Sequence, residues 1–166
     1  MKGGPNMEQK LLEELYQMHY REALLYALAL CGDEILAEDL VSDAFVKALV
    51  SLDNSHPAFQ YWLFRVLKNQ WLDHLRREKR QPNFSPAILP TPEQIILQDE
   101  RNQVLWQALN RLSSTDREVI TLHYFSGLTI RQIAQMLGQT SGAVKTRLSR
   151  LRQRIKQEME EQGYEI

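Results

Sequence analysis

The 166-residue chain lacks the cysteines that build disulfide scaffolds and metal sites, and it lacks the long apolar runs that build membrane spans. Its one cysteine is Cys31, which excludes an internal disulfide and a cysteine-based metal site. The longest apolar run, from Ala23 to Cys31, is far shorter than the ~20 residues that cross a membrane, and no secretory signal precedes it. We therefore expect a cytoplasmic protein without membrane insertion, in which Cys31 is a small buried hydrophobic residue.

Patterns of common catalytic sites are also missing from the sequence. It has neither a glycine-rich phosphate loop nor a serine in a nucleophile-elbow motif. None of its histidines shows the spacing of paired metal ligands; they are His19, His56, His74 and His123. We therefore expect a protein that is not an enzyme and that needs no cofactor or metal.

The net charge of −1 hides a strong separation of acidic and basic residues along the chain. Acids cluster between Asp33 and Asp43, and a basic cluster runs from Arg76 to Arg80. Between Lys145 and Lys156 there are six cations and no acid, whereas an ordinary solvated helix face mixes both signs. Such patches suit a protein partner on one surface and nucleic acid on the others, although the acidic patch could equally be plain solvated surface.

Proline divides the chain into two blocks. Pro82, Pro86, Pro90 and Pro92 fall within eleven residues, and proline both removes helix donors and disfavours helix in the residue before it. We expect an N-terminal domain over residues 1–80, a Pro-rich linker over 81–94 and a C-terminal domain over 95–166. Each domain is small, but a few packed helices can form a core at that size.

The whole chain is predicted to be helical. Both blocks are rich in Leu, Ala, Gln, Glu and Arg, and neither shows the alternation typical of strands. The fifth expected helix is predicted to be capped by Thr115, with Glu118 three residues later. The first five expected helices are Met7 to Leu30, Glu34 to Leu49, Phe59 to Arg80, Glu93 to Leu112 and Thr115 to Tyr124. The expected fold class is all-α.

A helix-turn-helix follows these helices. Apolar residues at 130, 133, 134 and 137 share one helical face, so residues 129–137 are predicted to form a short amphipathic helix. Thr129 and Gln132 have the spacing of a capping box at its start. Gly138 supplies the turn, and Thr140 or Ser141 can cap the next helix. A buried stripe is expected on that helix, made of Val144, Leu148, Leu151 and Ile155.

The opposite face of the last helix carries the groups that can recognise DNA. Lys145, Thr146, Ser149, Arg150 and Gln153 have donors and acceptors that can read base edges in a major groove. Arg147, Arg152 and Arg154 flank this face at positions suited to phosphate. Duplex DNA is therefore the first partner to consider.

Three further segments must be explained together with this motif: AEDLVSDAFVKAL (37–49), SLDNSHPA (51–58) and FQYWLFRVLKNQWLDHLRREKR (59–80). In this order, ahead of a proline-containing linker and a helix-turn-helix, they resemble the extracytoplasmic-function sigma factors of bacteria. That resemblance covers nearly the whole chain. It implies a transcription initiation factor that binds core RNA polymerase and directs it to promoters. It also implies two helical domains, joined by a linker that threads toward the active-site channel of the polymerase.

The same resemblance assigns surfaces in the N-terminal domain. Residues 37–45 would dock on the clamp helices of the largest polymerase subunit, with Glu38, Asp39 and Asp43 as polar contacts and Leu40, Val41 and Phe45 as apolar ones. The loop from Leu52 to Pro57 would capture a flipped base of the minus-ten element through Asp53 and Asn54. Single-stranded DNA would follow the third helix, where the implied contacts are Tyr61, Trp62, Arg65, Lys68, Asn69, Arg76, Arg77, Lys79 and Arg80, with Trp71 as a further aromatic.

In the C-terminal domain the resemblance places the last helix in the major groove of the minus-thirty-five element. Lys145, Thr146, Ser149 and Arg150 would contact bases, while Arg131, Arg147 and Arg154 would contact the DNA backbone. Many members of the family are held inactive by a membrane-anchored anti-sigma factor, so such a partner is a further expectation. The sequence does not specify the promoter, the inducing signal or the captured base.

A stand-alone transcriptional regulator that binds duplex DNA without polymerase is the main alternative. The segments STDREVITL and TIRQIAQMLG are similar in character to the helix-turn-helix of response regulators. That alternative gives the basic third helix no role. An anti-sigma-type sequestering module would explain the acidic helix but not the cations of the last helix.

Overall fold

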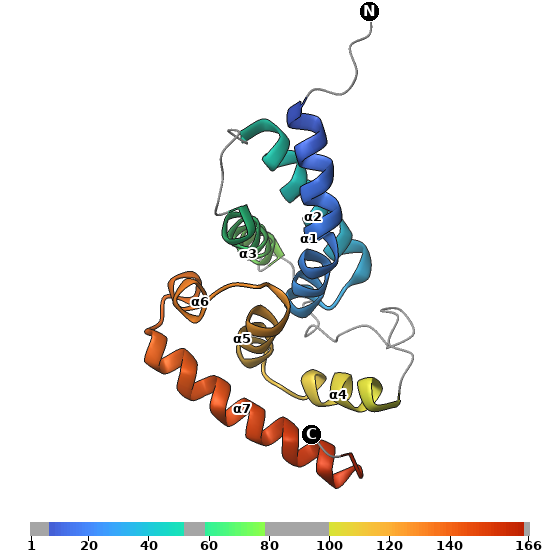
Figure 1. The fold of residues 1–166 in the computed structure, drawn as a ribbon, viewed down its shortest axis with the longest axis vertical. Helices are drawn as coiled ribbons and strands as arrows, with labels where there is room; N and C mark the ends of the chain where they lie inside the picture. The colour runs from blue at the N-terminus through green and yellow to red at the C-terminus, as the bar shows by residue number, and fades with distance from the viewer. Residues whose placement is uncertain (1–6, 52–58, 79–99, 165–166) are drawn as a thin grey trace, which may run out of the picture.

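A computed structural model of the chain describes residues 7–51, 59–78 and 100–164. The expected base-capture loop and the expected proline linker lie outside these ranges. Within them every regular element is an α-helix (Figure 1), which agrees with the predicted fold class. The helices are α1 (Met7–Cys31), α2 (Glu34–Ser51), α3 (Phe59–Glu78), α4 (Glu100–Asn110), α5 (Ser114–Phe125), α6 (Ile130–Leu137) and α7 (Ser141–Glu161).

The first unit is a bundle of α1, α2 and α3, each of which contacts the other two. On α2 the spacing of Ala37, Val41, Ala44 and Ala48 places four fully buried side chains on one face. The chain reverses between α1 and α2 at Gly32, whose φ of 65° is favourable for glycine. The Asp33 side chain then accepts the backbone N–H groups of residues 35 and 36 at 3.0 and 3.2 Å, which caps α2.

The second unit is built around α7, which packs against α4, α5 and α6. Its predicted inner stripe is confirmed, because Val144, Leu148, Leu151 and Ile155 are all buried. Met159, one turn further along, is buried as well and extends this stripe toward the end of the helix. The apolar spacing of four, three and four residues is therefore the feature that fixes the orientation of α7.

The two units meet at α5, which lies in the middle of the molecule between α1 and α7 (Figure 1). Its six consecutive residues from Arg117 to Leu122 are all buried. Since a helix turns once every 3.6 residues, this run is covered on every side. Buried residues of both units form one continuous apolar cluster. In this structure the two units therefore share a single core.

The predicted helix boundaries agree with the structure at α1 and α2 to within two residues. The predicted cap of α5 was wrong. Ser113 is the N-cap, with extended backbone and a side-chain oxygen that accepts the Asp116 N–H at 3.2 Å, whereas Thr115 is an exposed residue inside the helix. The run Ser113–Ser114–Thr115 offers three side chains that can cap, and the helix starts early enough to use the first. The last two residues expected in the third helix, and the first seven expected in the fourth, lie outside the described residues.

Candidate nucleic-acid interface

The helix-turn-helix is formed as its local sequence predicts. Thr129 accepts the Gln132 N–H at 3.1 Å and the Gln132 side chain accepts the Thr129 N–H at 3.0 Å, which completes the capping box. Gly138 ends α6 in the left-handed region with φ 64°. Thr140 then caps α7 by accepting the Ala143 N–H at 3.1 Å. These contacts fix the start of α7 relative to α6.

The outward face of α7 carries the residues predicted to contact bases. Lys145, Thr146, Ser149 and Arg150 are all exposed, and they lie in the first half of the helix. The structure thus brings four donor-bearing or acceptor-bearing side chains together at one end of α7, where a helix can enter a major groove. Arg131 is exposed on neighbouring α6.

The cations that flank this face differ in their exposure and in their contacts with other side chains. Arg147 is partly exposed and its Nε lies 3.7 Å from the Asp116 carboxylate on α5. Arg152 donates to the Tyr124 hydroxyl at 2.9 Å and also contacts the His123 ring. Arg154 is more exposed and forms an ion pair at 3.6 Å with Glu158, within α7. Arg147 and Arg152 thus help hold α7 on α5, a role that the sequence did not predict.

The third helix presents a second cationic face. Arg65 is exposed and its guanidinium lies 5.5 Å from the centre of the Tyr61 ring. Asn69, Arg76 and Arg77 are exposed as well. Tyr61 and Trp62 are only half-buried, and both lie against the edge of the core. Of the remaining predicted contacts in this domain, Asp53, Asn54, Lys79 and Arg80 lie outside the described residues.

Two of the expected strand contacts on α3 are placed differently. Trp71 is buried and stacks on the ring of His74, so it offers no free platform for a base. Lys68 does not point freely into solvent, because its ammonium contacts the Glu118 carboxylate of α5 at 2.7 Å. Lys68 and its neighbours Tyr61, Arg65 and Asn69 line a polar hollow of about 200 Å³ whose opposite wall is Gln135 and Met136 of α6.

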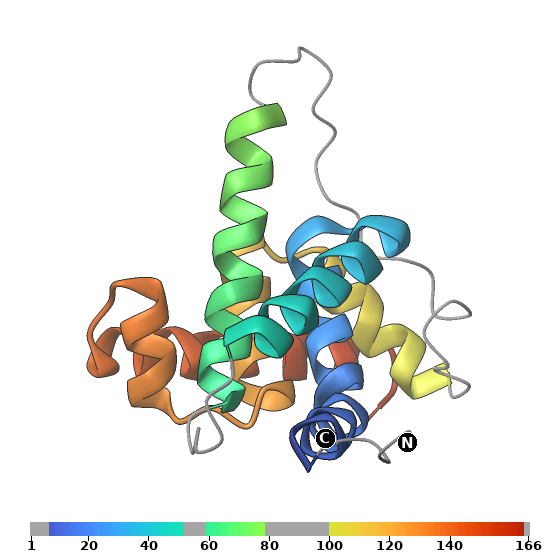
Figure 2. The same cartoon turned by 90° about the horizontal axis from the view of Figure 1, so that it is seen from above.

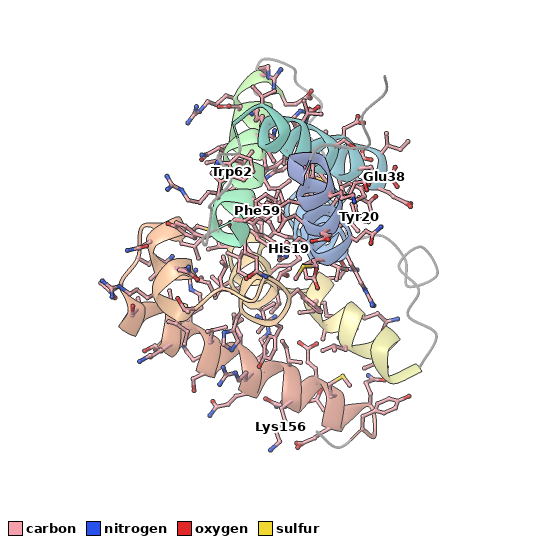
Figure 3. The ribbon with its side chains drawn as sticks, turned by 45° about the horizontal axis from the view of Figure 1, so that its top comes forward. His19, Tyr20, Glu38, Phe59, Trp62 and Lys156 are labelled. Atoms are coloured by element: carbon pink, nitrogen blue, oxygen red, sulfur yellow. The ribbon has the colours of Figure 1, made fainter. Side chains whose placement is uncertain are left out.

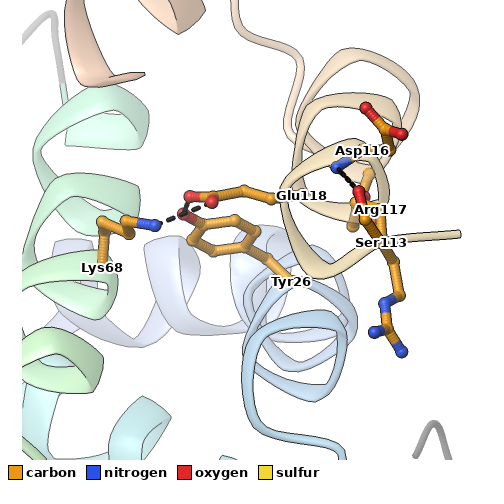
Figure 4. A network of polar contacts seen from close by, with 7 residues as sticks. Tyr26, Lys68, Ser113, Asp116, Arg117 and Glu118 are labelled. Atoms are coloured by element: carbon orange, nitrogen blue, oxygen red, sulfur yellow. Dashed lines mark hydrogen bonds and ion pairs between the residues drawn. The ribbon is translucent and has the colours of Figure 1, made fainter. Parts of the chain in front are cut away.

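Glu118 joins three helices of the two units (Figure 4). Its second carboxylate oxygen accepts the Tyr26 hydroxyl of α1 at 2.8 Å. Burial first, and the Glu118 charge second, raise the pKa of Tyr26 well above its usual value, so this hydroxyl stays protonated and donates. No sequence pattern pointed to this network, because Glu118 is 92 residues from Tyr26 and 50 from Lys68.

The acidic helix α2 has an exposed acidic face and a buried apolar face. Glu38, Asp39 and Asp43 are exposed, as the predicted polymerase contacts require, and Figure 3 shows Glu38 at the edge of the molecule. Leu40, Val41 and Phe45 are buried in the protein's own core. This corrects the expectation that they supply apolar contacts to a partner. The helical spacing of residues 37, 40, 41, 44, 45 and 48 could have revealed this inner face.

Apolar side chains that do face solvent on α2 were missed. Ile35 is 74% exposed, Val46 57% and Val50 82%. They lie outside the inner stripe, among the exposed acids. A second apolar surface is a hollow of about 580 Å³ between α4, α5 and α7, lined mainly by aliphatic and aromatic side chains, with Arg152 and Lys156 at its edge. Both surfaces suit contact with a protein better than contact with DNA.

Among the described residues, no group of three His, Cys, Asp or Glu side chains could hold a metal ion. Nor is any described helix long and apolar enough to cross a membrane.

Comparison with known proteins gives a consistent result for both units. Residues 15–81 match the family model for sigma-70 region 2, and residues 102–155 match that for sigma-70 region 4. SigL of Mycobacterium tuberculosis, an extracytoplasmic-function (ECF) sigma factor, is 38% identical over 157 residues, covering 88% of this chain and 87% of SigL. The chain belongs to the ECF sigma factors.

Another ECF sigma factor and two solved structures are similar to this chain at lower identity. SigM of Bacillus subtilis is 28% identical, covering 87% of this sigma factor and 93% of SigM. RpoE, solved in complex with the anti-sigma factor NepR from Bartonella quintana, has a TM-score of 0.72 at 27% identity and covers 91% of this chain and 98% of that one. CnrH in complex with the cytosolic domain of CnrY has a TM-score of 0.59 at 26% identity and covers 89% and 86%.

The sigma factor therefore directs core RNA polymerase to promoters, using region 2 for the minus-ten element and region 4 for the minus-thirty-five element. Its family is not enzymatic. The stand-alone regulator is no longer needed as an alternative, because the match to region 2 gives the acidic and basic helices of the first unit a role.

Proposed function

We propose that residues 1–80 hold core polymerase and the minus-ten element, that residues 95–166 hold the minus-thirty-five duplex, and that residues 81–94 join them. The division is supported by the two bundles, α1–α3 and α4–α7, each of which carries its own cationic face. Each bundle then binds DNA in a different form. The first binds a single strand after the promoter duplex has opened, and the second binds an intact duplex.

In the second unit, exposed side chains in the first half of α7 contact bases. Lys145 and Arg150 are long donors that can reach guanine edges, and Thr146 and Ser149 can accept or donate beside them. Arg131, Arg147 and Arg154 contact phosphates on either side. Arg147 keeps its contact to Asp116 in this role, because that contact lies at 3.7 Å and leaves part of the guanidinium exposed.

In the first unit, single-stranded DNA follows the cationic face of α3. The exposed residues along this helix are Arg65, Asn69, Arg76 and Arg77. Lys68, which is paired with Glu118 in this structure, is a further proposed contact on the same helix. Arg80, which lies outside the described residues, is a further proposed contact. Tyr61 and Trp62 lie beside the cationic face with partly exposed rings on which bases can stack. Asp53 and Asn54 capture the flipped base of the minus-ten element.

The polymerase docks on the exposed face of α2. Glu38, Asp39 and Asp43 supply charge, and exposed Ile35 and Val46 supply the apolar contacts that buried Leu40, Val41 and Phe45 do not. Exposed acids mixed with exposed apolar side chains fit a protein surface that is basic and partly apolar. RpoE was solved with the anti-sigma factor NepR, and CnrH was solved with the cytosolic domain of CnrY. We propose that an anti-sigma factor binds this chain too.

The single observation that carries this assignment is the exposed acidic face of α2, whose carboxylates at 38, 39 and 43 form no ion pair with any described residue. Purified sigma factor should bind core RNA polymerase in a pull-down and support specific run-off transcription from the promoter upstream of its own gene. Asp39→Arg should abolish both without loss of folding, as followed by circular dichroism. Glu14→Arg makes the same charge change at an exposed site on α1 and should leave both intact. Equal loss in the two variants would contradict docking through α2.

A further inference from the structure

Lys68 is a predicted DNA contact whose charge is already neutralised inside the protein. Its ammonium lies 2.7 Å from Glu118, and the two side chains are only 21% and 6% exposed. A carboxylate of region 4 thus forms an ion pair with a lysine of region 2 (Figure 4). Charge-assisted contacts of this length are among the stronger hydrogen bonds in proteins.

Glu118 is well satisfied only while the two units are together. Burying a carboxylate is costly unless its oxygens are hydrogen-bonded and its charge is paired. Here Tyr26 supplies one donor from α1 and Lys68 supplies the other from α3. Both partners belong to the first unit, so any separation of the units removes both at once.

Besides the packing of α1 on α5, further contacts between the units are made by α3. Gln60 donates from its side-chain amide to the Ser126 carbonyl at 2.6 Å. Gln135 and Met136 of α6 close the polar hollow above Tyr61, Arg65 and Asn69. Figure 2 shows α6 beside α3, and Figure 1 agrees. The helix-turn-helix therefore lies against the surface proposed to hold the single strand.

This arrangement cannot persist on a promoter. The two promoter elements lie about 25 base pairs apart, which at ~3.4 Å per pair is roughly 85 Å of DNA. One molecule in which α6 lies beside α3 cannot place α7 on one element and α3 on the other. The closed arrangement is thus a different state from the one that initiates transcription.

We propose that Glu118 is an internal substitute for a DNA phosphate, and that it holds the free sigma factor closed by occupying Lys68. This inference rests on the proposed strand-binding role of α3. Single-stranded promoter DNA and Glu118 compete for the same ammonium group. Binding of the strand is therefore weakened by the fraction of molecules that are closed, and opening restores it.

Binding of DNA tests the competition. The probe is a fluorescein-labelled single strand of about 12 nucleotides, a length within the usual site sizes, measured by anisotropy with the free sigma factor. Glu118→Gln should tighten binding by at least about threefold, because the open fraction rises. In a Lys68→Ala background the same substitution should give no gain, since both the closing contact and the phosphate contact are already lost.

Two controls separate this effect from a change in net charge or in folding. Glu14→Gln removes one exposed negative charge on α1 and should change binding less than Glu118→Gln does. Tyr26→Phe removes only the buried hydroxyl, leaves every charge in place and should also tighten binding, by less than Glu118→Gln. An equal gain from Glu118→Gln with and without Lys68 would overturn the proposal.

The distance between the units gives an independent test that needs neither polymerase nor transcription. Spin labels on Met18→Cys in α1 and Gln157→Cys in α7, both exposed positions, would be placed in a Cys31→Ala background. Pulsed electron paramagnetic resonance should give one narrow distribution of the distance between the two labels in the free protein. Glu118→Gln or the single strand should add a longer component. Identical distributions in all samples would refute the role of Glu118 in holding the units together, whereas failed run-off transcription alone would refute only the proposed function.

Discussion

At the scale of single residues, the short-range signals in the sequence were the most informative. Thr129, Gln132 and Thr140 make the predicted capping contacts because each acts within three residues of its own position. The error at α5 was of the same local kind, since Ser113, Ser114 and Thr115 all can cap. Only the geometry distinguishes Ser113 as the residue that accepts the Asp116 N–H.

Substitution of the two candidate caps should show this difference. Ser113→Ala removes the acceptor for an orphan N–H at the start of α5, and it should lower the free energy of unfolding by about 1 kcal/mol. Thr115→Ala should change it by less than about 0.5 kcal/mol, because Thr115 is exposed within the helix. Urea unfolding followed by circular dichroism measures both. A larger cost at Thr115 would contradict the assignment of the cap.

Arg150 should determine specificity at one position of the minus-thirty-five element. Arg150→Ala should cost about 1–3 kcal/mol for the base pair it contacts and little elsewhere. The measurement is binding of the polymerase holoenzyme to duplexes that each carry one substituted base pair. Lys156→Ala, an exposed cation near the other end of α7 (Figure 3), is the matched control and should not alter specificity. Equal weakening by Arg150→Ala on every duplex would identify a phosphate contact instead.

His123 should make stability depend on pH. Burial first, and the charge of Arg152 second, lower the pKa of His123. Below its unfolded pKa of about 6.5 the unfolded chain binds more protons than the folded one, so the free energy of unfolding falls as pH falls through this range. In His123→Gln this decrease between about pH 7.5 and pH 5.5 should be smaller. His19, whose pKa is also lowered by burial, is present in both proteins, so its contribution cancels. An unchanged decrease would contradict a role for His123.

At the scale of elements, hydrophobic periodicity predicted which face of each helix is buried. The stripe of α7 is buried as expected. On α2, by contrast, the family resemblance assigned Leu40, Val41 and Phe45 to a partner, although their spacing with Ala37 and Ala44 places them on the inner face. In this case the helical period was a better guide to burial than the resemblance.

The turn between α6 and α7 offers a clean comparison of two glycines. Gly138 has φ 64° and Gly142 has an ordinary helical backbone, and an added Cβ would meet nothing within 4 Å at either position. Gly138→Ala should therefore cost about 1–2 kcal/mol from backbone strain alone. Gly142→Ala, inside α7, should stabilise by about 0.5–1 kcal/mol. Thermal unfolding would detect the opposite signs, and a shift of the same sign in both would contradict this reading of the turn.

At the scale of the whole molecule, the sequence predicted the two units but not how they meet. The contacts of Glu118 with Tyr26 and Lys68 span 92 and 50 residues. The sequence analysis assigned Lys68 to DNA and Glu118 to the cap of α5, and it gave Tyr26 no role. Periodicity and capping describe neighbours in the sequence, so a long-range polar network of this kind leaves no trace in either.

Because the units share one core in the closed state, they should unfold together. Leu148→Ala, a fully buried position in α7, should lower the free energy of unfolding by about 2–5 kcal/mol. The urea midpoints of amide signals from α2 and from α7 should then decrease by the same amount, as measured by nuclear magnetic resonance. If the signals of α2 kept their original midpoint, the units would be unfolding independently.

The burial of the middle of α5 also limits how the sequence can vary. Residues Arg117 to Leu122 are covered by the first unit on one side and by the helix-turn-helix unit on the other. A substitution there must suit the closed molecule and also the region 4 unit that remains after opening. Two structural requirements thus constrain one short helix. The sequence of α5 should therefore change more slowly among descendants of this protein than the exposed face of α7, which can change along with its promoter.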